Sequence, residues 1–175
     1  MNKETLKLGV LLFTICAVST ILLAGLNAIT LPVITANSEK IQNEYRGMVL
    51  PGADSFENAE EGVYFGIKGN EKIGVTVNTS ANGYGGAIEV MTGIDKELKV
   101  TGVKILSQSE TAGLGANCTG DEFLSQYVGK TAGMKVVKTM AGETEIQAIS
   151  GATRTTNAVT AAVEEALKKA KEVLK

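Results

Sequence analysis

The sequence has no histidine, and only two of its 175 residues are cysteine. Cys16 lies inside a long apolar segment and is badly placed to pair with Cys118, so no disulfide is expected. For the chain alone, these absences exclude a histidine-ligated haem, a blue-copper or ordinary zinc site, a four-cysteine iron–sulfur cluster and a histidine-based catalytic triad. We therefore expect no metal site, and any redox centre must be an organic cofactor.

An excess of charge of one sign is also lacking, because 17 basic residues face 19 acidic ones and the net charge is −2. This balance predicts no nucleic-acid binding.

A run without any charged residue extends from residue 8 to residue 38. The length of the chain therefore suits one membrane anchor and one globular domain.

Residues 8–31 are long enough to cross the hydrocarbon core of a bilayer, which takes roughly 20 apolar residues. A cleaved secretion signal is the alternative, because Lys3 and Lys7 give a basic start, but the apolar run exceeds the roughly 7–15 residues of a signal core. Positive charge before the span predicts that residues 1–7 stay in the cytoplasm. We expect a single-pass protein of the cell (inner) membrane with an extracytoplasmic domain.

The rest of the chain predicts an α+β fold, with a central antiparallel-rich sheet and flanking helices. We expect a connecting helix over residues 32–50 and a folded domain over residues 51–175. The acidic residues 53–62 are typical of a loop, and residues 93–96 are typical of a turn. The predicted strands are residues 63–68, 73–77, 87–92, 98–106, 135–138 and 145–149, and the predicted helices are residues 121–128 and the segment after residue 156.

Two glycine-rich loops interrupt this pattern, residues 81–86 and residues 109–116. Glycine allows backbone N–H groups to point toward a ligand, and Tyr84 offers a flat face on which an aromatic ring can rest. An ordinary hairpin or connection that needs positive φ is the alternative for each loop. Neither loop fits a Rossmann fingerprint or a P-loop, because the required spacing and the Lys-Ser/Thr pair are lacking.

Residues 150–156 place four hydroxyl groups and two very small residues directly before an amphipathic helix. The first turn of a helix offers unpaired N–H groups and a partial positive charge, so this segment is suited to hold a phosphate. The alternative is an ordinary helix cap, since Ser and Thr are common there.

Four motifs of the chain are considered together: Gly83-Tyr84-Gly85-Gly86, Gly93-Ile94-Asp95, Glu110-Thr111-Ala112-Gly113-Leu114-Gly115 and Ser150-Gly151-Ala152-Thr153. They resemble the motifs of the FMN-binding domain family, in the same order and at similar intervals. Within that family the chain is most similar to the G subunits of Rnf-type ion-translocating complexes, which are related to the C subunits of Na⁺-translocating NADH:quinone reductases. The chain departs from the family at Gln147, Ala112 and Gln108, where Asp, Pro and His are frequent.

The resemblance implies an FMN joined through a phosphoester to Thr153 by a separate flavin transferase. It also implies that the two glycine-rich loops embrace the isoalloxazine, that Tyr84 or Leu114 covers its faces, and that Thr155 hydrogen-bonds the phosphate. The implied cofactor-binding residues are Ser150, Gly151, Ala152, Thr155, Gly83, Tyr84, Gly85, Glu110, Thr111, Leu114 and Gly115.

The function that this resemblance implies is a membrane-anchored electron carrier with no catalytic residue of its own. Its partners are the other subunits of an Rnf-type complex, in which electron flow between ferredoxin and NAD⁺ is coupled to movement of Na⁺ or H⁺. Two alternatives stay open. One is an anchored extracytoplasmic module that binds a flavin reversibly, and the other is an extracellular reductase subunit that uses the same covalent flavin.

Overall fold

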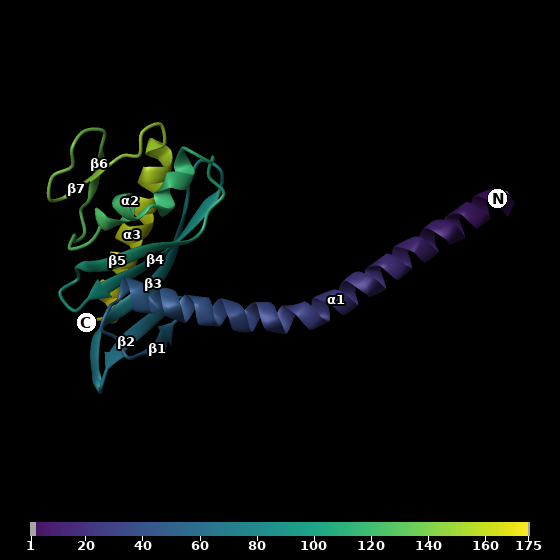
Figure 1. The fold of residues 1–175 in the computed structure, drawn as a ribbon, viewed down its shortest axis with the longest axis horizontal. Helices are drawn as coiled ribbons and strands as arrows, with labels where there is room; N and C mark the ends of the chain where they lie inside the picture. Colours follow the sequence, from purple (N-terminus) through teal and green to yellow (C-terminus); the bar gives the residue numbers. More distant parts are fainter. Residues whose placement is uncertain (1–2, 175) are drawn as a thin grey trace. The chain divides into compact units, whose positions relative to one another are not determined.

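The computed structural model describes residues 3–174, and it divides into two compact units that meet between Gln42 and Asn43. From residue 3 onward the first unit is helical, since the helix α1 spans Lys3–Val49 (Figure 1). The helix continues through Pro32 without a break, so the expected boundary between residues 31 and 32 falls inside one helix. Residues 7–32 form a stretch that is long and apolar enough to cross a membrane.

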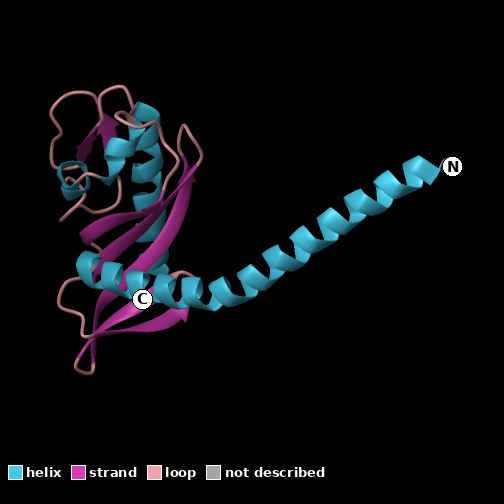
Figure 2. Ribbon diagram, turned by 45° about the vertical axis from the view of Figure 1, so that its right-hand side comes forward, coloured by secondary structure: helices cyan, strands magenta, loops and turns pink. Residues whose placement is uncertain are grey.

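The second unit is built on an antiparallel sheet, whose strands are magenta in Figure 2. The sheet has five strands in the order β1-β2-β3-β4-β5. Each strand pairs with the next one along the chain, so the sheet is a simple meander. The predicted α+β class is confirmed. The strands are β1 (Ser55–Glu60), β2 (Val63–Lys68), β3 (Glu71–Asn82), β4 (Ala87–Asp95) and β5 (Val100–Ser107).

Two local predictions within this sheet are wrong. Residues 55–60 of the expected acidic loop form the edge strand β1, which pairs with β2 on one side only and therefore does not need an apolar sequence. Gly93 lies inside β4 and not in a turn, and the chain turns only after Asp95. Glycine marks a close backbone approach there, which sequence alone does not separate from a turn.

The segment after β5 carries short elements and ends in the long helix α3 (Thr153–Val173). The strands β6 and β7 pair in parallel, so they do not form a hairpin around residues 141–142. The short elements are the 3-10 helix η1 (Gly115–Thr119), α2 (Asp121–Ser125), β6 (Lys135–Val137) and β7 (Glu145–Gln147).

The core lies between α3 and one face of β3 and β4. Ala162, Ala166 and Ala170 recur every four residues along α3 and are fully buried, so the helix approaches the sheet closely. This approach lets the Thr79 hydroxyl on β3 donate to the carbonyl of Ala162 at 3.0 Å. The position of α3, and of the residues at its start, is therefore fixed by the middle of the sheet.

The opposite face of the sheet receives the last turn of α1, which belongs to the second unit. A Cβ on Gly93 would overlap the carbonyl of Val49, and one on Gly102 would lie 2.8 Å from the Cα of Val49. The Val49 carbonyl accepts a hydrogen bond from the Thr101 hydroxyl at 2.5 Å. Glycines on adjacent strands thus make a shallow seat for the end of the anchor helix.

Replacing Gly93 with Ala tests this seat, because the added methyl overlaps the backbone of Val49. We expect a loss of about 1–3 kcal/mol in the free energy of unfolding, the usual cost of overpacking. Gly47→Ala is the matched control, because a Cβ at Gly47 meets no atom within 4 Å and Ala favours helix. Thermal unfolding of the full chain in detergent compares the two variants. Equal melting temperatures of Gly93→Ala and Gly47→Ala would contradict the close contact between Gly93 and Val49.

Candidate functional site

Three segments that sequence analysis singled out meet at the start of α3. They are the tyrosine loop (residues 81–86), the glutamate loop (residues 109–116) and the threonine turn (residues 150–156). The tyrosine loop comprises the end of β3 and its connection to β4, and the glutamate loop follows β5. Hydrogen bonds between side chains and backbone, described next, join the three segments.

The carboxylate of Glu110 lies at the centre of this meeting point and is only 8% exposed. One oxygen, Oε1, accepts the backbone N–H groups of Tyr84 and Gly85, each at 2.8 Å. The other oxygen, Oε2, accepts the hydroxyl of Thr155 at 2.5 Å. A buried carboxylate is tolerated when donors surround it, and here the donors come from the two other segments.

The charge of Glu110 is stabilised by these same donors. Burial by itself raises the pKa of this carboxyl group, but the hydrogen bonds from Thr155, Gly85 and Tyr84 and the nearby charge of Arg154 outweigh it. The pKa of Glu110 is therefore below its usual range, and the group is ionised at neutral pH. The site contains a buried negative charge that belongs to the protein.

Two of the predicted glycines are required by the packing around this carboxylate, and a third by the close approach of the two loops. A Cβ on Gly83 would overlap Oε1 of Glu110, and a Cβ on Gly115 would lie 2.6 Å from its Oε2. A Cβ on Gly85 would overlap the carbonyl of Ser109. These glycines let the loops close on each other and on Glu110, whereas sequence analysis expected them to admit a ligand.

The four hydroxyl groups of the threonine turn divide into two pairs. Thr155 donates to Glu110, while Thr156 donates to the carbonyl of Ala152 at 3.1 Å and accepts the N–H of Ile149 at 3.0 Å. Within residues 3–174, the side chains of Ser150 and Thr153 make no hydrogen bond. Thr153 is half-buried as the first residue of α3, and Ser150 is exposed.

The start of α3 is suited to an anion. Ala152 occupies the cap position, and no side chain of the described residues caps the helix there. The first backbone N–H groups of a helix have no intrahelical acceptor, and the helix dipole favours negative charge beside them. An anionic group on Thr153 would therefore lie at the favourable end of a 21-residue helix.

The rim of the site exposes two apolar side chains, as expected for a surface that covers an aromatic ring. Tyr84 is 74% exposed and Leu114 is 46% exposed. A Cβ on Gly151, whose φ is +73°, would lie 3.1 Å from a methyl group of Leu114, so this leucine lies over the threonine turn. Thr111 is exposed, and its carbonyl accepts the N–H of Leu114 at 3.2 Å. The residues present thus fit a flavin phosphate and an exposed ring.

Some predicted contacts are already made within the protein. The tyrosine loop was expected to embrace a flavin with its backbone groups, but the N–H groups of Tyr84 and Gly85 are bonded to Glu110. The Thr155 hydroxyl, expected on the phosphate, is bonded to Glu110 as well. Sequence reasoning did not assign Arg154, whose Nε donates to the carbonyl of Gly83 at 3.0 Å. The sequence feature that could have indicated it is that Arg154 is the one charged residue among the small and hydroxyl residues of the turn.

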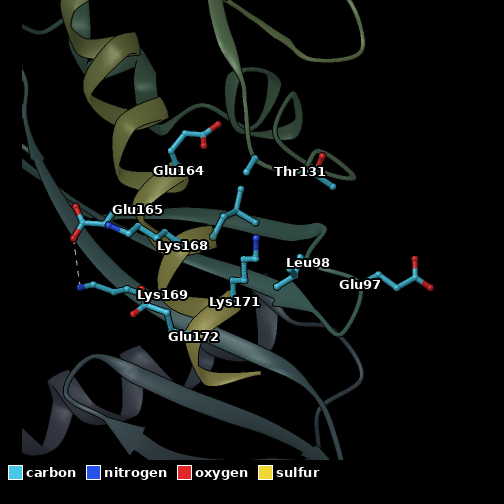
Figure 3. Close-up of a pocket in the computed structure, with 11 residues that line it drawn as sticks. Glu97, Leu98, Thr131, Glu164, Glu165, Lys168, Lys169, Lys171 and Glu172 are labelled. Atoms are coloured by element: carbon cyan, nitrogen blue, oxygen red, sulfur yellow. Dashed lines mark ion pairs between the residues drawn. The ribbon is translucent and has the colours of Figure 1, made fainter. Parts of the chain in front are cut away.

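Among the described residues, one groove adjoins the threonine turn and another lies farther along α3. The first is lined by η1, α2 and residues 147–150, so it opens beside Ser150. The second runs along the last turns of α3 past Leu98 (Figure 3). None of the predicted site residues lines this second groove, and its glutamates and lysines are mixed, with Lys169 3.6 Å from Glu165.

Replacing Glu110 with Gln keeps the shape of the side chain and removes its titration. The pKa of Glu110 is lower in the folded protein than in the unfolded chain, where it is about 4.3, so the unfolded chain binds more protons between the two values. The stability contributed by this carboxylate is present above about pH 4.3 and is lost as the pH falls through the folded-state pKa.

We therefore expect the melting temperature of Glu110→Gln to fall less steeply than that of the wild type below about pH 5. Thermal unfolding of the full chain in detergent, recorded from neutral to acidic pH, measures this difference. Parallel curves for the two proteins would mean that Glu110 titrates in the same way in both states.

Comparison with known proteins shows which family the chain belongs to. Residues 83–168 match the family model of the FMN-binding domain. The chain is 39% identical over 155 residues to the G subunit of the proton-translocating ferredoxin:NAD⁺ oxidoreductase complex of Clostridium ljungdahlii, covering 87% of this chain and 84% of that protein. It is 36% identical over 185 residues to the G subunit of the Na⁺-translocating ferredoxin:NAD⁺ oxidoreductase complex of Acetobacterium woodii, covering 92% and 89% of the two.

Two solved structures share the fold. The C subunit of the Na⁺-translocating NADH-quinone reductase of Parabacteroides distasonis superposes with a TM-score of 0.55 at 22% identity, over 65% of this chain and 62% of that chain. The match therefore spans less than two thirds of that protein. NqrC of Shewanella oneidensis superposes with a TM-score of 0.53 at 18% identity, over 73% of this chain and 74% of that chain. By its domain match and its two relatives of more than one third identity, the chain belongs to the FMN-binding domain family.

Proposed function

We propose that this chain is the membrane-anchored, flavin-carrying subunit of an Rnf-type complex, with FMN joined by a phosphoester to Thr153. The match to the FMN-binding domain and the relatives that are G subunits support an FMN-binding electron-transport subunit. The finer assignment to Thr153 depends on the site itself.

The assignment to Thr153 rests on one observation: some hydroxyl groups of the threonine turn are hydrogen-bonded within the protein and others are not. Thr155 and Thr156 use their hydroxyls in hydrogen bonds within the protein, and both side chains are buried. Among the described residues, Thr153 keeps an unpaired hydroxyl at the first position of an uncapped helix. Ser150 also has an unpaired hydroxyl, but it precedes the helix by three residues. Thr153 is therefore the hydroxyl that combines accessibility with the stabilising field of the helix start.

Attachment requires a donor that carries the flavin phosphate in an activated form, and we assign this role to a flavin dinucleotide held by the transferase. The Oγ atom of Thr153 attacks the phosphorus on the flavin side of the phosphoanhydride. A new O–P bond forms, the anhydride P–O bond breaks, and a nucleoside monophosphate leaves. The hydroxyl proton passes to a base of the transferase or to solvent. The resulting phosphodiester would carry one negative charge, which the N–H groups at the start of α3 are suited to stabilise.

The membrane anchor retains the domain at the membrane, and the covalent bond retains the flavin on the domain. Residues 7–32 are suited to hold the domain at a membrane, and the excess of basic residues before the span favours an extracytoplasmic domain. There a flavin that dissociated would be lost, so covalent attachment retains it. Bound FMN supplies the electron-transfer chemistry, while the chain binds and orients it between the other subunits of the complex. No charged residue lies between residues 8 and 31, so this helix by itself is a poor path for Na⁺ or H⁺.

Intact-mass spectrometry of the full chain, produced in a host that contains the flavin transferase, tests the proposal. The wild type should gain the mass of FMN less one water. Thr153→Val keeps the shape of the side chain but deletes the hydroxyl, so it should gain nothing. Ser150→Ala is the matched control and should gain the full adduct, because its hydroxyl is not the acceptor.

Covalent flavin on Thr153→Val would reject the site, and an unmodified wild type would reject covalent attachment altogether. A wild type of unmodified mass that releases FMN on denaturation would instead support the reversible binding module. Recovery of the modified protein alone, with no other subunit after mild solubilisation of its native membrane, would favour the separate reductase subunit.

A further inference from the structure

The peptide group between Gly83 and Tyr84 is held by side chains of opposite charge. Its carbonyl oxygen, on Gly83, accepts the Nε–H of Arg154 at 3.0 Å, and its N–H, on Tyr84, donates to Oε1 of Glu110 at 2.8 Å. Both groups belong to one planar unit, so the two bonds together fix its orientation. Hydrogen bonds to ionised groups are about twice as strong as neutral ones.

The two side chains are also connected to each other through α3. Thr155 follows Arg154 in the sequence and donates its hydroxyl to Oε2 of Glu110 at 2.5 Å. The contacts therefore close a ring that runs from Arg154 to the Gly83–Tyr84 peptide, on to Glu110, and back through Thr155. Thr153 directly precedes this ring. We refer to the ring of Glu110, Arg154, Thr155 and the Gly83–Tyr84 peptide as the peptide clasp.

We propose that Glu110 and Arg154 are positioning residues that hold the tyrosine loop against the first turn of α3 before the flavin is attached. The clasp thereby sets the position of Tyr84 relative to Thr153. This inference rests on the proposed attachment of FMN to Thr153, and it adds a role for two side chains that need not touch the flavin.

The exposure of Tyr84 explains why the loop needs such a clasp. Its side chain is 74% exposed, so packing of the ring contributes little to its position. Gly83, Gly85 and Gly86 surround it, and glycine loses more conformational freedom on ordering than any other residue. Within the loop, the Gly83 N–H also donates to the Gly86 carbonyl at 2.8 Å. Ordering the loop in advance lowers the entropy cost of binding a ligand.

The experiment uses the full chain in detergent, first without flavin and then during incubation with the flavin transferase and a flavin dinucleotide. Glu110→Ala and Arg154→Met break the clasp, while Glu110→Gln and Arg154→Lys are the conservative variants. Lys169→Met is the matched control, because it removes a positive charge from the same helix at an exposed position. The readouts are amide hydrogen exchange in residues 83–86, the rate of FMN incorporation by mass, and the visible circular dichroism of the attached flavin.

In the flavin-free protein, we expect the Tyr84 amide to exchange about tenfold faster in Arg154→Met and Glu110→Ala, because a hydrogen bond to a charged group is lost from its peptide. Incorporation of FMN should slow by a similar factor, and the circular dichroism of the flavin should weaken. Glu110→Gln should recover most of each signal, since its amide oxygen still accepts from Tyr84 and Gly85. The double variant Glu110→Ala/Arg154→Met should exchange no faster at Tyr84 than Glu110→Ala alone, because both residues act on one peptide.

The proposal is overturned if Arg154→Met matches Lys169→Met in exchange, incorporation and circular dichroism. It is also overturned if Glu110→Gln is as impaired as Glu110→Ala, because charge and not loop position would then be responsible. Should Glu110→Ala fail to fold, the comparison of Arg154→Met with Lys169→Met still decides the outcome, and Glu110→Gln is then compared with the wild type, which it should nearly match. Failure of the attachment site itself is seen separately, as covalent flavin on Thr153→Val, since every clasp variant keeps Thr153.

Discussion

The site depends on one buried carboxylate, that of Glu110. An ionised group in this position needs donors on every side, since an unpaired buried charge is costly. The protein supplies two backbone N–H groups from the tyrosine loop and one hydroxyl from α3. That demand explains the composition of the surrounding motifs, because Gly83 and Gly115 leave the space that the carboxylate occupies. Gly83 and Gly115 of the family motifs are therefore here the consequence of packing around an anion.

The sheet joins this site to the end of the anchor helix. The tyrosine loop comprises the end of β3 and its connection to β4, and the same two strands carry the buried contact with α3. On the opposite face, Gly93 of β4 receives the backbone of Val49. Small residues allow backbone to approach backbone on both faces, alanines on α3 and glycines on the strands. The tyrosine loop and the end of α1 are thus attached to one hairpin, β3–β4.

Elements with a local sequence pattern could be predicted from the sequence, whereas elements that depend on contacts with distant residues could not. Strand β2 was predicted at its bounds, because alternating apolar residues and flanking turns act within six residues. The edge strand β1 lacks that pattern and exists because it pairs with β2. The role of Glu110 was equally hidden, because its three donors lie 25, 26 and 45 residues away along the chain. Residue types indicated which segments form the site, but only the fold shows which polar atoms remain available.

Hydrogen bonding within the protein divides the hydroxyl groups of the threonine turn into those that support the fold and those that can be modified. Modification of Thr155 would remove a donor from a buried carboxylate, and modification of Thr156 would remove its bonds to Ile149 and Ala152. Thr153 lies beside both, yet its hydroxyl contributes no bond to the fold of the described residues. A group attached there would leave the clasp intact, and its first atoms would be held by a helix that is itself fixed to the sheet. For an electron carrier this matters, because a cofactor bonded to a rigid element keeps a defined position relative to its neighbours.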